Sequence, residues 1–459
     1  MQKILAIGWL TWKAAFRFRL FLVIAVLLLA SVVGIPILIK GDGTARGFTE
    51  ILITYTLSAI TALLGLSTLW LSCGTLARDI EECQMQMVAT KPVARWQIWL
   101  GKWLGIVSLN AALLVLSGAC VYGLLQWRAT RLPAAEQEKL RTQVLVARGV
   151  ARPPDYTAKI NADTDQILQE RLKQTSIPNA DLAAVRQQIL EQVKATGYEL
   201  VPPGYPREWR IDLGFARYFL RGKPLQLRIK FNTAQIGQSG TFVGLWQVGE
   251  PGTANVWRSE PMSLAAQTYH EFELPPDLFN RQGVLTIDFL NANDTTLLFP
   301  IEDGVEVRYP EGGFTLNFAR GLGILFCWMA LLAAIGLAAA SCMSFPVATF
   351  FSFAMLVVVF SSGTLANAVA SGTVGLGSPE QGHSLADQVL LPLYKGVLPV
   401  VGLVKNFSPI DALSSGLAIS WSELGTAFGQ IVLLFGGLFG LIGIALFTRR
   451  ELATAQGNQ

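Results

Sequence analysis

The sequence has little charge, almost no histidine, and no cysteine in its most polar segment. Asp, Glu, Lys and Arg make up 15% of the 459 residues, where about 25% is usual for a soluble domain. The 52% hydrophobic content excludes a disordered chain, and together with the low charge it disfavours a single soluble domain. His270 and His383 are the only histidines, and they lie far apart in the sequence. The sequence therefore disfavours a histidine-based metal site and a catalytic Ser/His pair.

The charges gather in one part of the chain. Residues 127–317 hold 43 of the 68 charged residues, and the other 268 positions hold 25. This segment is nearly neutral, with 21 basic and 22 acidic residues, so it does not favour nucleic acid as a partner. All five cysteines lie outside it, and no disulfide framework is indicated. We expect this segment to be solvated and the rest of the chain to lie in lipid.

Six stretches are apolar and long enough to cross a hydrocarbon core of about 30 Å, which takes roughly 20 residues. None of them contains Asp, Glu, Lys or Arg. The expected spans are 20–39, 51–77, 103–127, 321–344, 345–365 and 425–447. The segment 386–421 has an apolar part that Pro392 and Pro399 interrupt, and we interpret it as a re-entrant or interfacial segment on the outer side.

Lysine and arginine in the short flanks favour one orientation. The flanks of one side carry ten of these residues, namely Lys3, Lys13, Arg17, Arg19, Arg78, Lys91, Arg95, Lys102, Arg449 and Arg450. The opposite flanks carry five, namely Lys40, Arg46, Arg320, Lys395 and Lys405. We therefore expect both termini inside, with 1–19 as an interfacial amphipathic helix and 449–459 as a cytoplasmic tail. Residues 128–317 then form an outer domain.

The outer domain divides into two predicted parts. Residues 128–204 are expected to be helical, with one apolar face at Leu182, Val185, Ile189 and Val193. Residues 205–317 change to a period of two, which predicts short strands at 225–231, 241–248, 270–274, 284–290, 296–299 and 305–309. Such a run of strands is typical of an antiparallel, jelly-roll-like β-sandwich. Its aromatic residues Trp246, Trp257, Tyr269 and His270 either line a binding site or pack in the core.

The motifs of an independent enzyme are missing. The sequence has no G-x-x-x-x-G-K-[ST] phosphate loop, no Cys/His cluster with metal spacing and no G-x-S-x-G. We therefore expect no catalytic residue, no metal and no cofactor in this chain. Ion-coupled transport is disfavoured as well, because such carriers place ionisable groups inside the membrane. Any energy for transport or mechanical work must then come from a partner.

The inner loop 78–102 offers an entry point for that energy. Its first half favours a helix with acidic residues at the start, where the helix dipole stabilises them. Lys91-Pro92 then breaks the helix, and a second helix enters span three through Gly101 and Gly105, whose spacing permits close packing. The loop is either a lever that moves spans two and three or an ordinary interfacial loop with positive charges.

Two regions resemble the ABC-2-type transporter permeases, which include the permeases of nitrous-oxide-reductase maturation and gliding-motility systems. The first is Arg78-Asp79-Ile80-Glu81-Glu82, followed by Lys91-Pro92-Val93-Ala94-Arg95 and by Gly101 and Gly105. The second comprises Ser408-Pro409-Ile410-Asp411-Ala412, Ile419-Ser420-Trp421-Ser422-Glu423-Leu424 and Phe447-Thr448-Arg449-Arg450-Glu451-Leu452. The stretch from Ile4 to Arg19 is similar to that family's interfacial helix. The insert of about 190 residues between spans three and four departs from the family's short outer loop.

The resemblance implies a six-helix α+β membrane subunit in a bacterial cytoplasmic membrane, working with a separate ATPase. Two ATPase copies would dock on the family's coupling helix and bind ATP and Mg. The matching coupling residues are Arg78, Asp79, Glu81, Glu82, Lys91, Pro92 and Arg95. A second permease chain, the same or homologous, would pair with this one. Gly425, Gly429, Gly436 and Gly440 in the last span have the spacing for packing within the chain or against that second permease.

Two other functions remain open at this point. In the first, the complex transports no solute, and the outer domain 128–317 transmits motion to an extracytoplasmic protein or glycan. In the second, the chain is a membrane-anchored binding protein whose sandwich recognises glycan, although six spans exceed what an anchor needs.

Overall fold

The computed structural model describes residues 2–17, 20–38, 44–82, 93–154, 165, 198–233, 240–250, 255–301, 303–360 and 407–450, with single positions at 392, 396, 398 and 402. The chain forms two compact units. A helical unit comprises Met1–Val146 and Gly313–Gln459, and a strand unit comprises Ala147–Gly312.

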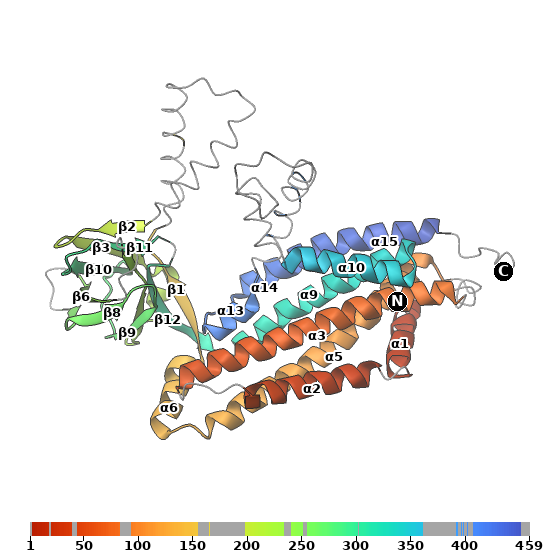
Figure 1. The fold of residues 1–459 in the computed structure, drawn as a ribbon, viewed down its shortest axis with the longest axis horizontal. Helices are drawn as coiled ribbons and strands as arrows, with labels where there is room; N and C mark the ends of the chain where they lie inside the picture. Colours follow the sequence, from red (N-terminus) through yellow and green to blue (C-terminus); the bar gives the residue numbers. More distant parts are fainter. Residues whose placement is uncertain are drawn as a thin grey trace. The chain divides into compact units, whose positions relative to one another are not determined.

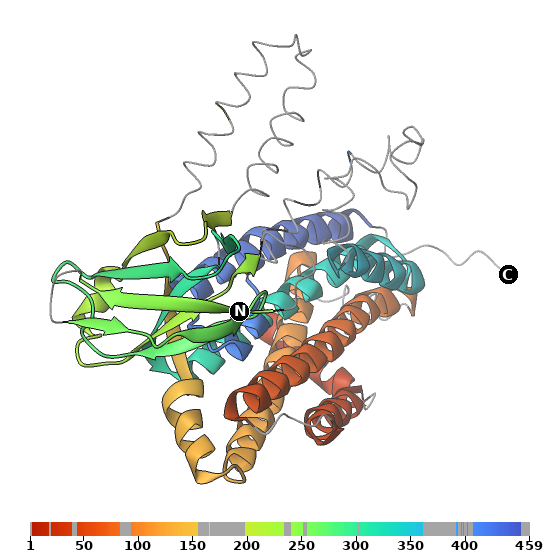
Figure 2. The same ribbon diagram turned by 60° about the vertical axis from the view of Figure 1, so that its left-hand side comes forward.

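The helical unit consists mainly of helices. They include α1 (Gln2–Arg17), α2 (Leu20–Leu38), α3 (Ala45–Glu81), α5 (Arg95–Ala129), α9 (Phe314–Cys342) and α10 (Phe345–Phe360). The longer ones run alongside one another in Figures 1 and 2, and α1 runs across them in Figure 1. One continuous final helix is made of α14 (Trp421–Ala427), the π-helical η3 (Phe428–Gly436) and α15 (Gly437–Arg449). Shorter elements are α6 (Ala134–Lys139), the π-helical η1 (Leu140–Val144) and α13 (Pro409–Ser414).

Four of these helices are long and apolar enough to cross a membrane. They are Ala45–Glu81, Arg95–Ala129, Phe314–Cys342 and Trp421–Arg449, and they cover the second, third, fourth and sixth expected spans. The apolar parts of α2 and α10, Val23–Pro36 and Phe345–Val359, are shorter, so the first and fifth spans stay predictions. Most of the expected re-entrant segment 386–421 lies outside the described residues.

The start of the predicted coupling loop differs from expectation. Residues 78–81 form no separate helix, because α3 continues through them to Glu81. No glycine or proline interrupts the chain between Ala77 and Glu82, so nothing ends the helix at the edge of the apolar stretch. The second predicted helix of the loop is confirmed as the first turns of α5, which begins at Arg95.

Small residues set the closest helix contacts. A Cβ atom on Gly101 would lie 2.7 Å from Cβ of Ile7 on α1, and one on Gly105 would lie 2.7 Å from Cβ of Thr11. A Cβ on Gly336 of α9 would overlap the Ser72 hydroxyl of α3. The glycine pair of α5 thus lies directly against α1, and α9 against α3, which together bury an extensive apolar core.

The strand unit contains three sheets among its described residues. Their strands are β1 (Val146–Ala151), β2 (Tyr198–Val201), β3 (Pro206–Asp212), β4 (Leu225–Ile229), β5 (Asn232–Thr233), β6 (Thr241–Gly249), β7 (Val256–Arg258), β8 (Met262–Ala265), β9 (His270–Leu274), β10 (Val284–Asn291), β11 (Leu297–Pro300) and β12 (Val305–Gly313). The sheet orders are β1-β12-β4-β9, then β3-β10-β6-β7 with β8 beside β6, and β2-β11-β5.

The two larger sheets bury their apolar faces in one hydrophobic core. Leu225, Leu227 and Ile229 of β4 belong to the same buried cluster as Ile287 and Phe289 of β10. Pairs such as β4–β9 and β10–β3 are antiparallel. The expectation of strands at 225–231, 241–248, 270–274, 284–290, 296–299 and 305–309 is confirmed, with small shifts at the ends.

The expectation of a purely helical region at 128–204 is wrong at two places. After α6 and η1, the chain forms strand β1, and β2 begins at Tyr198. The core side of β1 carries the small residues Ala147, Gly149 and Ala151 instead of large apolar ones, because the Tyr309 ring occupies the space beside Gly149. The alternation in β1 is therefore too weak to indicate a strand from sequence. The predicted helical face Leu182 to Val193 lies outside the described residues.

The contact between α1 and α5 predicts a position-dependent effect of alanine. We expect Gly101→Ala to destabilise the folded chain by about 1–3 kcal/mol, because the new methyl group overpacks the contact with Ile7. On the same helix, nothing lies within 4 Å of a Cβ at Gly123, so Gly123→Ala should be neutral or stabilise by up to about 1 kcal/mol. Thermal unfolding of the purified full chain measures both. Equal effects at the two positions would contradict the close α1–α5 contact.

Candidate functional site: the charged end of the helical unit

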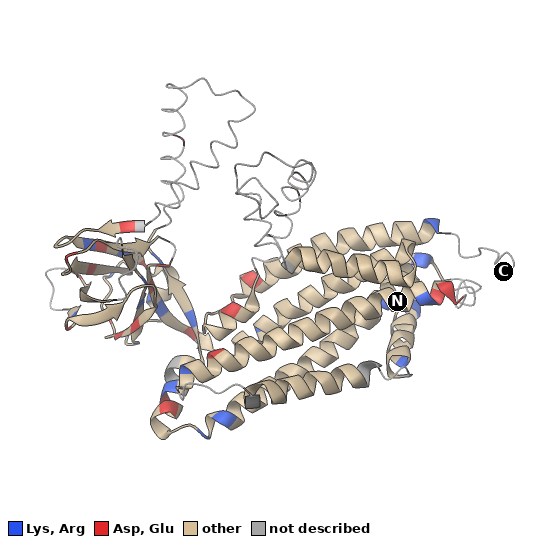
Figure 3. Ribbon diagram, viewed as in Figure 1, with Lys and Arg blue, Asp and Glu red and all other residues tan. Residues whose placement is uncertain are grey.

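Charged residues lie near the ends of the long helices, and the middles of these helices are free of them, as Figure 3 shows for the helical unit. At one end, contacts link Arg78, Asp79 and Glu81 of α3 to Lys102 of α5 and to the start of α10, and a separate set links Arg95 of α5 to Arg450, which follows α15. We call these six residues the charged end. Five of the six lie in the segment 78–102, which the sequence predicts to be the coupling loop, and the sixth is Arg450.

Arg95 joins the start of α5 to the end of α15. Its Nη1 lies 2.9 Å from the carbonyl oxygen of Phe447, and 2.8 Å from those of Thr448 and Arg450. The last carbonyls of a helix have no partner within the helix, and their partial negative charge favours a nearby cation. Arg95 therefore caps α15.

Arg450 repeats this arrangement at the end of α9. Its Nη1 lies 3.1 Å from the carbonyl oxygen of Ala340, and 3.3 Å and 3.4 Å from those of Met343 and Ser341. The backbone of Arg450 accepts from Arg95 while its side chain donates to α9. Two guanidinium groups thus connect the ends of α5, α15 and α9 in series.

An ion pair joins α3 to α5 next to these caps. Lys102 Nζ lies 2.5 Å from Asp79 Oδ2 and also donates to the carbonyl of Thr75 at 2.7 Å. The Lys102 residue is only 8% exposed. A buried ammonium group is stabilised by a charged partner, so Asp79 takes part in a structural ion pair although its side chain is partly exposed.

Glu81 and Arg78 fix the start of α10. Oε1 of Glu81 accepts a hydrogen bond of 2.8 Å from the backbone nitrogen of Phe345, the first residue of α10. The Arg78 guanidinium lies 4.2 Å from the centre of the Phe345 ring, which is a cation–π contact. A carboxylate at a helix N-terminus is stabilised by the helix dipole, so the end of α3 positions the beginning of α10.

The remaining predicted coupling residues are placed differently. Glu82 is the C-cap residue of α3, and its backbone nitrogen donates to the carbonyl of Arg78 at 2.8 Å. Lys91 and Pro92 lie outside the described residues. Arg78, Asp79, Glu81 and Arg95 thus each contact a partner in the chain. Residues 83–92 of the loop lie outside the described residues.

The four predicted packing glycines of the last span have unequal surroundings. Nothing described lies within 4 Å of a Cβ at Gly425 or Gly429. A Cβ at Gly436 would meet the carbonyl of Ile431 in its own helix at 3.4 Å, and one at Gly440 would meet the Trp99 ring of α5 at 3.3 Å. Packing within the chain therefore accounts for Gly440.

Local caps explain the second family-like region. Ser408 donates to the Asp411 carboxylate at 2.7 Å at the start of α13, and Ser420 accepts from the Glu423 nitrogen at 3.0 Å at the start of α14. Asn317 of α9 accepts from the Ile419 nitrogen and donates to the Leu417 carbonyl, both at 2.7 Å. These bonds fix the chain where it enters the last long helix.

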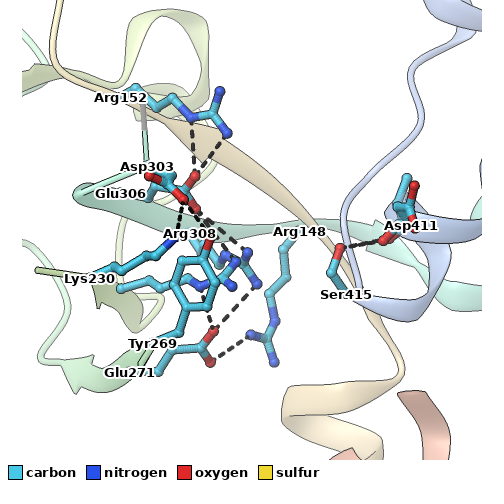
Figure 4. A network of polar contacts seen from close by, with 12 residues as sticks. Arg148, Arg152, Lys230, Tyr269, Glu271, Asp303, Glu306, Arg308, Asp411 and Ser415 are labelled. Carbon is cyan, nitrogen blue, oxygen red and sulfur yellow. Dashed lines mark hydrogen bonds and ion pairs between the residues drawn. The ribbon is translucent and has the colours of Figure 1, made fainter. Parts of the chain in front are cut away.

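The strand unit carries a second polar cluster, shown in Figure 4. The antiparallel register places Arg228 of β4 between Glu306 of β12 and Glu271 of β9, and it lies 3.8 Å from each. Arg308 lies 3.4 Å from Glu271 and 3.6 Å from Glu306. Arg308 is 1% exposed and Glu306 3%, so a face that alternation alone marks as polar is in fact buried and ion-paired.

Arg148 and Arg152 of the β1 region extend this network. Arg148 lies 3.6 Å from Glu271, and Arg152 donates to Glu306 at 2.8 Å. Each glutamate thus has several cationic neighbours, which compensates the cost of burying its charge.

At the edge of the network, Asp303 accepts hydrogen bonds from Lys230 at 3.1 Å and from the Tyr269 hydroxyl at 2.5 Å. Burial opposes ionisation, but these two bonds outweigh it and lower the pKa of Asp303 below its usual value. The bond to Asp303 raises the pKa of Lys230. Burial, and then the bond to Asp303, raises the pKa of Tyr269.

The aromatic residues proposed for a ligand site belong largely to the core. Trp246 is 2% exposed and packs on Trp209, Phe289 and Phe299. The His270 ring lies 2.8 Å from the Ala265 carbonyl and stacks on Phe231. Trp257 packs against the core, whereas Tyr269 is 44% exposed. Core packing is therefore the correct interpretation for Trp246.

The described residues hold no group of three or more His, Cys, Asp or Glu side chains that converge on a metal position. Comparisons of the chain with protein-family models, curated proteins and solved structures give no match. Membership of a family therefore stays a proposal.

Sequence reasoning missed three features of these sites: the helix capping by Arg95, the helix capping by Arg450, and the Asp79–Lys102 pair. One signal was present for the pair, because Asp79 and Lys102 are opposite charges next to adjoining spans. The capping by Arg95 and Arg450 carried no such signal, because the acceptors are backbone carbonyls, which every residue type provides.

The Asp303 contacts predict a pH-dependent loss of stability. The lowered pKa means that ionised Asp303 stabilises the folded chain fully above its usual pKa of 3.8, and that this contribution is lost as the pH falls below that value. We expect Asp303→Asn to cost about 1–2 kcal/mol near neutral pH and progressively less below pH 3.8. Thermal unfolding from neutral to acidic pH measures this, with the exposed Asp294→Asn as control. A cost that stays constant with pH would contradict the assignment.

Proposed function

We propose that this chain is the membrane subunit of an ATP-binding-cassette transporter of the ABC-2 type. Its six helices would cross a bacterial cytoplasmic membrane with both termini in the cytoplasm, and the strand unit would form a jelly-roll-like sandwich outside. Four membrane-length helices and helix middles free of charge support this proposal. The single observation that carries it is the charged end, where two sets of contacts join α3 to α5 and α10, and the start of α5 to the ends of α15 and α9.

These contacts supply a mechanism for coupling. Two copies of a separate ATPase, which bind ATP and Mg, would dock on the segment 78–95 of two permease chains. Because Glu81 holds the start of α10 and Arg95 holds the end of α15, a displacement of this segment would move several spans together. In this mechanism, Asp79, Glu81 and Arg95 transmit motion within the chain, and the ATPase contacts other parts of the segment.

The coupling mechanism predicts that Arg95 is required for transmission. We expect the native complex to contain a copurifying ATPase, and Arg95→Gln to reduce ATP hydrolysis by the complex roughly tenfold, because one lost charge-assisted hydrogen bond is worth about 1.5–3 kcal/mol. Arg449→Gln is the matched control, since Arg449 is an exposed arginine in the last turn of α15. The measurement is ATPase activity at equal complex recovery.

Two outcomes would contradict the proposal. One is a full chain that never copurifies with an ATPase from its native membrane. The other is an Arg95→Gln complex that hydrolyses ATP like the Arg449→Gln complex while both have the same subunit composition.

A second candidate function is transmission of motion to an extracytoplasmic partner without solute transport. Three aromatic side chains at η2 (Gly214–Tyr218) favour it, because Phe215 is 89% exposed, Tyr218 69% and Phe219 45%. Exposed aromatic residues beside Arg217 and Lys223 are typical of protein-docking surfaces.

The substitution Phe215→Ser with Tyr218→Ser distinguishes the two functions. If the strand unit docks a protein, a partner captured by crosslinking in the native membrane is lost while ATP hydrolysis by the complex persists. Thr241→Ser and Ser263→Thr, on the β6–β8 pair of the same unit, serve as the control. Unchanged crosslinking in the aromatic variant would exclude this loop as the docking surface.

A further inference from the structure

An apolar groove of about 480 Å³ lies at the end of the helical unit where α2 ends and α3 begins. Its apolar walls are Val33 of α2, Phe48 of α3 and Leu124 of α5, and Trp127, Arg128, Arg131 and Leu132 complete the lining. This volume falls within the roughly 300–1,000 Å³ of typical small-molecule sites.

Two guanidinium groups stand at this groove without an anionic partner among the described residues. Arg128 lies in the last turn of α5, and Arg131 follows that helix. Arg131 lies 4.0 Å from the centre of the Trp127 ring, a contact that holds it beside the groove. The nearby Glu136 carboxylate is engaged elsewhere, since it accepts from the Ala45 nitrogen and from Lys139, both at 2.9 Å.

The groove borders on surface that is suited to lipid. Val33 is 47% exposed, and Val23, Val26 and Leu27 of the same helix are more than half exposed. Trp127 is 51% exposed at the end of a membrane-length helix, where tryptophan is typical of the membrane–water interface. The site therefore combines an apolar slot with a cationic rim at the depth of lipid headgroups.

We propose that this groove binds an anionic phospholipid of the surrounding membrane. The phosphate would lie between Arg128 and Arg131, and one acyl chain would lie along Val33, Phe48 and Leu124. Charge complementarity selects this occupant, because a second copy of the apolar α2 surface would leave both guanidinium groups uncompensated. The proposal concerns the membrane-embedded chain itself and does not depend on an ATPase partner.

Native mass spectrometry of the full chain in detergent tests this site. The probes are phosphatidylglycerol and phosphatidylcholine with the same acyl chains, supplied in equal amounts. We expect the chain to retain phosphatidylglycerol preferentially. Each arginine near a membrane surface contributes about fivefold to anionic lipid affinity, so Arg128→Gln with Arg131→Gln should lower phosphatidylglycerol binding by about 25-fold and leave phosphatidylcholine binding unchanged.

Two further variants separate the groove from general charge. Val33→Trp fills the groove and keeps both arginines, so it should reduce the binding of both lipids. This variant is also an independent test if the Arg128→Gln, Arg131→Gln chain does not fold. Arg449→Gln removes an exposed arginine at the end of another membrane-length helix and should change nothing.

Three results would overturn the proposal. They are equal retention of the two lipids by the unaltered chain, an equal loss of phosphatidylglycerol in Arg449→Gln, and displacement of phosphatidylglycerol by millimolar inorganic phosphate. The last result would identify free phosphate as the ligand.

Discussion

The helical unit depends on how it satisfies the backbone carbonyls at its helix ends. In an apolar surrounding, an unpaired carbonyl costs several kcal/mol. The carbonyls at the ends of α9 and α15 find their partners in two arginines. Arg95 covers the end of α15, and Arg450 covers the end of α9. Because Arg450 takes part in both contacts, neither helix end can shift without changing the other. This constraint gives the charged end its ability to transmit motion.

The neighbouring contacts extend the same logic to α3 and α10. Lys102 and Asp79 neutralise one another where α3 meets α5, and Glu81 supplies the acceptor that the first nitrogen of α10 requires. Away from this end, the helices meet through glycines such as Gly101 and Gly336 rather than through charges. Charged side chains thus lie near the helix ends, as a low-dielectric environment favours, and the anionic-lipid groove at Arg128 follows the same rule.

Features with a strong repeating pattern could be predicted from the sequence. The alternation around Leu225, Leu227 and Ile229 predicts β4, because large residues on one side must enter a core. Long apolar stretches predict α3, α5, α9 and the last helix. Strand β1 was missed because its core side is made of alanine and glycine.

Features that depend on pairing in three dimensions could not be predicted. Arg308 and Glu306 look like solvent-facing residues of an alternating strand, and only the register with β4 and β9 shows them to be buried and paired. For the candidate site, the sequence indicated the positions 78–81 and 95 but not that their side chains hold other helices. Helix caps made by distant arginines leave no local pattern in a single sequence.

The coupling mechanism requires that the charged end face the cytoplasm, where an ATPase can reach it. Cys342, an exposed cysteine at the end of α9, is a natural reporter for this side, since Arg450 binds the adjacent Met343 carbonyl. A variant that retains Cys342 as its only cysteine can be treated with a membrane-impermeant maleimide in intact cells and in inverted membrane vesicles. We predict labelling in the inverted vesicles only. Labelling of Cys342 in intact cells would place the charged end outside and contradict the coupling mechanism.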